Sequence, residues 1–128
     1  MCVTDGNLRT QPKFVVFLSQ LLLLFSTCPS CKMPDPSVEV RRFGTMAKVV
    51  TICNNHHCKK KENAWRSQPN VLDTKIPAGN FLLLFAILVA GGSASKVLKI
   101  FKHMGLACIS LATFFRHQQV SHFIKSLQ

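Results

Sequence analysis

The feature that most constrains the fold of this chain is a pair of cysteine motifs on either side of a short β-hairpin pattern. The motifs have the spacings C-x2-C and C-x4-C and consist of Cys28, Cys31, Cys53 and Cys58. Between them, residues 37–43 alternate apolar and polar side chains, Gly44 can turn the chain, and residues 46–52 have the pattern of a partner strand. A hairpin of this length buries almost no apolar surface, so we expect a covalent or metal cross-link through the cysteines.

The spacing of the cysteines is typical of structural zinc sites. Four thiolates can complete one tetrahedron around Zn²⁺, and each closely spaced pair supplies two ligands. His56 lies between the second pair, so Cys53 with His56 is an equally reasonable second half-site. Disulfides in a secreted chain and unligated thiols are the remaining interpretations. The sequence predicts one structural Zn²⁺ bound by Cys28, Cys31, Cys53 and Cys58, with His56 as the alternative to Cys58.

The charge of the chain favours a polyanionic partner. Lys and Arg number 16 against 5 Asp and Glu, which gives a formal net charge of +11. All the acids precede Ile76, so the C-terminal part is uniformly basic. This balance indicates binding to nucleic acid or to an anionic membrane surface. Metal-dependent nucleases need several convergent carboxylates, and the scattered acids, together with the lack of known catalytic motifs, predict a chain that is not an enzyme.

Two hydrophobic runs, residues 14–25 and 81–90, raise the question of whether the chain enters a membrane. Both are shorter than the roughly 20 apolar residues that a membrane-spanning helix needs, so we expect both to form buried core helices. The first run also resembles a secretory signal peptide, because Arg9 and Lys13 precede it and the small residues 26–28 follow it. A small secreted or membrane-associated protein is therefore the alternative reading of the whole chain.

The C-terminal part has the pattern of consecutive helices. Asn80 is placed to cap the second hydrophobic run, which we expect to be buried on all sides, and Gly91 is placed to end it. The next helix begins at one of two serines, Ser93 or Ser95, and has a basic face opposite an apolar one. The predicted apolar face consists of Val97, Ile100, Phe101 and Met104.

Gly105 and Ser110 then separate two helical segments in the order of a helix-turn-helix motif. The positions expected to pack between these helices are Ile100, Met104, Leu106, Leu111 and Phe114. In such a motif the second helix reads base edges, while nearby cations bind phosphates. The predicted base contacts are Ser110, Thr113, Arg116 and His117, and the predicted phosphate contacts are Lys96, Lys99 and Lys102. A plain helical hairpin with solvated lysines is the alternative.

A series of short segments between about residues 13 and 119 also carries a family pattern. The segments are Lys13-Phe-Val-Val-Phe17, Cys28-x-x-Cys31, Trp65-Arg-Ser-Gln-Pro69, Ile76-Pro-Ala-Gly-Asn80, Lys96-Val-Leu-Lys-Ile-Phe101, Met104-Gly105, Ile109-Ser110 and Thr113-Phe-Phe-Arg-His-Gln118. In order and spacing they are similar to a family of uncharacterised, transposon-derived proteins that recur in many copies in animal genomes. The chain departs from the family pattern between Cys53 and Cys58 and in the following residues, 59–61.

The resemblance implies a transposase-like protein with a cysteine knuckle and a helical DNA-binding region ahead of a nuclease-like core. Because this chain ends at Gln128, it also implies a truncated copy or partial gene model that keeps the targeting end, acts in the nucleus and lacks the catalytic part. The expected function is DNA binding without catalysis.

The expected fold class is α+β. We predict an N-terminal helix, a small zinc-ribbon-like hairpin unit and a helical unit that contains the helix-turn-helix, over residues 13–26, 28–68 and 77–124. The corresponding domain division is a disordered N-terminus, a helix plus zinc-ribbon-like unit, a linker and a helical unit, over residues 1–12, 13–68, 69–76 and 77–128.

Overall fold

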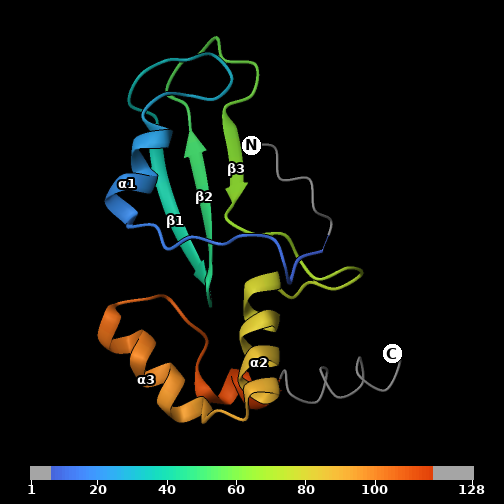
Figure 1. Ribbon diagram of the computed structural model, residues 1–128. Helices are drawn as coiled ribbons and strands as arrows, with labels where there is room; N and C mark the ends of the chain where they lie inside the picture. The colour runs from blue at the N-terminus through green and yellow to red at the C-terminus, as the bar shows by residue number, and fades with distance from the viewer. Residues whose placement is uncertain (1–6, 117–128) are drawn as a thin grey trace. The chain divides into compact units, whose positions relative to one another are not determined.

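The structure is a computed structural model that describes residues 7–116, and it has the mixed α+β composition that the sequence predicts. The chain divides into two compact units. The first comprises Met1–Arg41 and Lys48–Trp65, and the second comprises Arg42–Ala47 and Arg66–Gln128. The elements in chain order are α1 (Leu18–Leu22), the 3-10 helix η1 (Leu23–Phe25), β1 (Ser37–Phe43), β2 (Met46–Ile52), β3 (Glu62–Arg66), α2 (Ala78–Ala90) and α3 (Ala94–Met104) (Figure 1).

The predicted hairpin is confirmed and is extended by a third strand. β1, β2 and β3 form an antiparallel sheet with β2 in the centre. The central strand supplies the buried side chains Met46, Val49, Val50 and Thr51. The short strand β3 was not predicted, because its residues 62–66 carry mixed charged, amide and aromatic side chains with little β-pattern of their own. It forms a strand through its pairing with β2.

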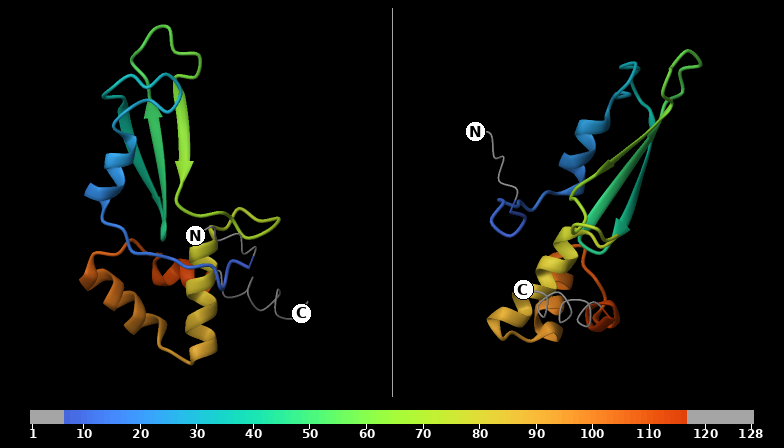
Figure 2. Two further views of the ribbon diagram at one scale, coloured as in Figure 1. Left: turned by 45° about the horizontal axis from the view of Figure 1, so that its top comes forward. Right: turned by 90° about the vertical axis from the view of Figure 1, so that its right-hand side faces the viewer.

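The prediction of a buried N-terminal helix over 13–26 is wrong. The helical part covers only α1 and η1, which lie on one face of the sheet (Figure 2). Phe14, Phe17 and Leu24 are 84%, 75% and 73% exposed, and only Phe25 is buried, with its ring centroid 5.6 Å from that of Trp65. No side chain caps the start of α1, and three strands offer too small a face to cover the whole apolar run. In the part of the chain that the structure describes, no helix has the length and apolarity to cross a membrane.

The prediction that Asn80 caps α2 is wrong. The helix starts at Ala78, after Pro77, whose fixed φ suits the first turn of a helix. The Asn80 side chain instead lies buried within the second unit. It accepts hydrogen bonds from the amide and the hydroxyl of Thr45, both at 2.7 Å, and donates to the carbonyl of Phe43 at 3.0 Å.

This close approach explains the glycine in the hairpin turn. Gly44 has a φ of +64°, and a Cβ there would lie 2.5 Å from Oδ1 of Asn80 and 2.5 Å from a methyl carbon of Ile109. Any larger residue would therefore be strained both in its backbone and by contact. Gly44 therefore has two roles. It forms the turn of the hairpin, and its lack of a side chain lets the hairpin tip pack within the second unit.

The expectation that α2 is buried on all sides is also wrong. Leu84 and Ile87 are buried, whereas Val89 is 56% exposed. The two buried side chains form one cluster with Ile109 and Phe114, against which Val97 and Leu98 of α3 pack. A helix in a unit of this size has core on one side only, because few elements are present to cover the other.

The predicted ends of α2 and α3 are confirmed. Gly91 and Gly105 both adopt the left-handed conformation that ends a helix, and Ser93 caps α3 by accepting a hydrogen bond from the amide of Lys96. A further helical segment covers residues 111–116.

The side-chain packing expected for a helix-turn-helix is observed only in part. Ile100, Met104 and Leu111 are 56%, 65% and 41% exposed, although Phe114 is buried. The partly buried side of α3 runs through Val97 and Leu98, so it shares Val97 with the predicted apolar face but leaves out Ile100 and Met104. The order of helix, glycine turn and helix is present, and Phe114 of the second segment belongs to the cluster against which Val97 and Leu98 of α3 pack.

Candidate metal centre

The two cysteine loops bring four thiols together in the first unit. Cys28 and Cys31 lie in the loop before β1, and Cys53 and Cys58 lie in the loop between β2 and β3. Figure 1 shows these loops at the same end of the sheet. All four sulfur atoms lie within 4.8 Å of one another. The cluster is the one that the cysteine spacing predicted.

The sulfur separations are compatible with one tetrahedral metal ion. The distance is 3.8 Å between the sulfurs of Cys28 and Cys58, and 3.5 Å between those of Cys31 and Cys53. A tetrahedral site with Zn–S bonds of about 2.3 Å requires sulfurs about 3.8 Å apart. A disulfide would bring two sulfurs to about 2.05 Å. All four cysteines are free thiols in the structure.

The cluster takes the place of an apolar core at this end of the sheet. Cys28, Cys53 and Cys58 are buried and pack together, with Cys31 partly buried beside them. Thiols contribute little apolar area compared with Leu or Phe side chains. Apolar burial therefore contributes little to the stability of the loops that carry them.

Backbone amides stabilise the thiolate form of the first pair. The turn is closed by hydrogen bonds from the amide of Lys32 to the carbonyl of Cys28 and from the amide of Cys28 to the carbonyl of Met33. Lys32 adopts a positive φ of 65°. The amide of Met33 lowers the pKa of Cys31 to about 6, and the amide of Cys31 lowers the pKa of Cys28. Since metals bind the thiolate, these amides favour ligation.

Asn55 connects the two pairs and was not identified from the sequence. Its amide donates to the sulfur of Cys53 at 3.4 Å, and its side-chain nitrogen donates to the sulfur of Cys31 at 3.7 Å. Its side-chain oxygen accepts from the amide of His57 at 3.0 Å. Burial raises the pKa of Cys58, so ligation there must displace a thiol proton. The only signal for Asn55 was its position two residues after a cysteine.

The structure favours Cys58 over His56 as the fourth ligand, because His56 is exposed and lies outside the cluster. We expect His56→Ala to retain one equivalent of Zn²⁺, since the substitution leaves all four thiols in place. Cys58→Ser should lose the metal. Zinc content of the reduced, purified variants measures the difference. Metal loss in His56→Ala with retention in Cys58→Ser would reverse the assignment.

The predicted DNA contacts lie in the second unit and do not form one group. Lys96, Lys99 and Lys102 are exposed on α3. The hydroxyl of Ser110 accepts from the amide of Thr113 at 3.2 Å and lies 2.9 Å from its hydroxyl, so these two residues cap the segment 111–116. Arg116 is exposed, and His117 lies outside the described residues. Of these positions, Lys99, Lys102 and Ser110 line one groove beside α3.

Comparison of the chain with protein-family models, with curated proteins and with solved structures finds no match. The class of the protein is therefore described from its fold and its cysteine cluster alone. It is a small α+β protein with a four-cysteine cluster of a size that fits a metal ion.

Proposed function

We propose that this chain is a zinc-stabilised, non-catalytic DNA-binding part of a transposase-like protein that acts in the nucleus. The observation that carries the proposal is the cluster of four thiols at tetrahedral separations. Four thiolates fill the coordination sphere of Zn²⁺ and leave no position for water or substrate. A metal bound in this way serves the fold and not a reaction.

The charge of the chain supports nucleic acid as the partner. Its formal net charge is +11, and α3 exposes Lys96, Lys99 and Lys102 on a helix that contains no acid. Duplex DNA attracts such a surface through its phosphates and releases bound counterions on association. The resemblance of the sequence to transposon-derived proteins supports the same partner.

Titration of the zinc-loaded chain with mixed-sequence duplex DNA at several salt concentrations tests this proposal. We expect the logarithm of the binding constant to fall linearly with the logarithm of salt concentration, by about 0.9 for each phosphate contacted. An unstructured peptide of the same length and charge is the control. Equal affinity of the chain and the peptide would show that the fold adds nothing to binding and would overturn the proposal.

A second candidate function is that of a small secreted or membrane-associated protein. The observation that favours it is the exposure of the first hydrophobic run, in which Phe14, Phe17 and Leu24 lack cover. An apolar segment exposed in this way is typical of an interaction surface. Carbonate extraction of expressing cells separates the two candidates. Retention in the membrane pellet, or cleavage of the chain near Cys28, would favour the second.

A further inference from the structure

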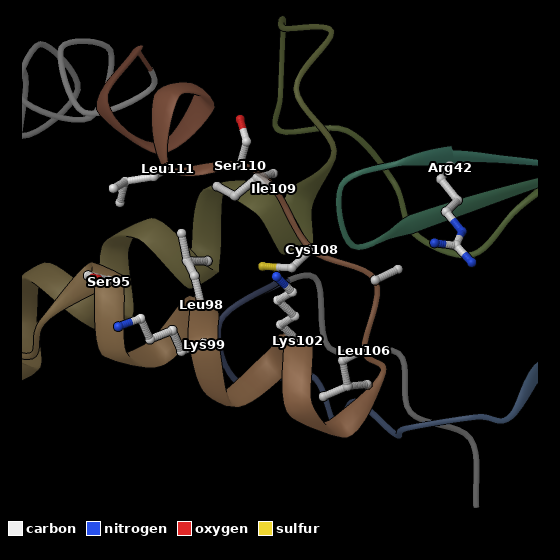
Figure 3. Close-up of a pocket in the computed structure, with 11 residues that line it drawn as sticks. Arg42, Ser95, Leu98, Lys99, Lys102, Leu106, Cys108, Ile109, Ser110 and Leu111 are labelled. Carbon is white, nitrogen blue, oxygen red and sulfur yellow. The ribbon is translucent and has the colours of Figure 1, made fainter.

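A groove of about 450 Å³ lies in the second unit, between α3, the connection 106–110 and the end of β1 (Figure 3). Its lining combines apolar side chains with cations that come from two distant parts of the sequence. The apolar residues include Leu98, Leu106 and Ile109, and the cations are Arg42, Lys99 and Lys102. No acidic residue lines the groove.

The structure distinguishes Arg42 from its neighbour Arg41. The guanidinium of Arg41 forms an ion pair with the carboxylate of Glu39 at 3.2 Å. In the described part of the chain, the three groove cations have no ion pair with an acid. Cations that share a groove without a compensating acid repel one another, so an anion seated there lowers their electrostatic energy.

The three lysines of α3, to which the sequence analysis assigned the same role, also differ in their positions relative to the groove. Lys99 and Lys102 line the groove, whereas Lys96 lies on the same helix but outside the lining. Figure 3 shows the two groove lysines on α3 and Arg42 on the neighbouring strand. Arg42 contributes a planar guanidinium, which can bind a phosphate through two parallel hydrogen bonds.

We propose that this groove is a principal phosphate-binding surface of the chain, and that it seats the sugar-phosphate backbone of one strand of duplex DNA. Arg42, Lys99 and Lys102, whose charged ends lie apart in Figure 3, bind different phosphates along the strand, and carbon atoms of the intervening deoxyriboses lie against Leu98 and Leu106. The occupant is inferred from charge complementarity together with the apolar part of the lining. This inference rests on the proposed function and deepens it by naming the contact surface.

The test compares three groove variants with two controls of equal charge, using the full, zinc-loaded chain and mixed-sequence duplex DNA. The groove variants are Arg42→Gln, Lys99→Gln and Lys102→Gln, and the controls are Arg41→Gln and Lys75→Gln, which lie outside the groove lining. Each variant loses one positive charge from an exposed side chain. We expect each groove variant to weaken binding about tenfold and to reduce the salt slope by about one unit. The controls should change affinity by about twofold or less.

Each outcome has a distinct meaning. Equal losses in groove variants and controls would show that binding follows net charge, and unchanged binding in the groove variants would show that phosphates bind elsewhere. Both results overturn the groove as the phosphate site and leave the proposed function standing. If the unmodified chain binds duplex DNA no better than a peptide of equal charge, the proposed function fails and this inference fails with it. Circular dichroism of every variant verifies that the helices remain folded.

Discussion

Replacing Cys53 with serine is expected to abolish zinc binding and to unfold the first unit. The substitution removes one of the four proposed zinc ligands from a cluster that takes the place of an apolar core. Structural Zn²⁺ contributes roughly 10–16 kcal/mol of apparent binding free energy in zinc-finger peptides. A small unit gains only about 3–5 kcal/mol from its apolar core, so loss of the metal should exceed the remaining stability.

Metal analysis and the dispersion of amide NMR signals measure this effect, and Cys108→Ser is the matched control. Cys108 is a free, partly buried thiol of the second unit and lies outside the cluster. Its variant should retain one equivalent of Zn²⁺ and a dispersed spectrum. Zinc added to the metal-free chain should also release protons, because thiols must ionise to bind it. A folded, zinc-free Cys53→Ser protein would contradict a structural role for the metal.

Replacing Asn80 with alanine is expected to lower the free energy of unfolding of the second unit by about 2–4 kcal/mol. Asn80 is 4% exposed and makes three hydrogen bonds to the hairpin tip. Its removal leaves the amide of Thr45 and the carbonyl of Phe43 without their partner. These hydrogen bonds are partly buried, and a polar group that loses its partner where water cannot replace it costs about 1–3 kcal/mol.

Urea denaturation followed by far-ultraviolet circular dichroism measures this loss through the signal of the helices. Asn54→Ala is the control, since Asn54 is exposed and donates one hydrogen bond of 3.4 Å to the carbonyl of Asp35. We expect the control to change stability by about 0.5 kcal/mol or less. Equal stabilities of the two variants would show that the Asn80 contacts do not hold the hairpin tip.

Several features of the fold follow from short-range signals. Gly91 and Gly105 end their helices where the sequence places them, because glycine enters the left-handed conformation at little cost. Ser93 caps α3 for an equally local reason, since its hydroxyl accepts from an amide three residues away. The spacing of the cysteines sufficed to predict their cluster, because each pair occupies one tight loop next to the hairpin.

The remaining features of the fold and of the site depend on interactions between residues that are distant in the sequence. The choice of Cys58 instead of His56 depended on how the second loop folds against the first. The role of Asn80 depended on a hairpin tip more than thirty positions earlier in the chain, at sequence separations of 35 and 37. Periodicity alone does not show which elements will cover a face.

The same reason explains the exposed apolar residues and the groove. Ile100 and Met104 repeat with helical spacing, yet the neighbours of α3 cover the adjacent side of the helix. Arg42 and Lys102 lie on elements far apart in sequence, and only the packing of the second unit brings them to one groove. The sequence by itself determined the C-terminal ends of α2 and α3, the hairpin and the cysteine cluster, because these depend on neighbouring residues. Tertiary structure decided the buried faces and the groove, because these depend on which distant elements come into contact.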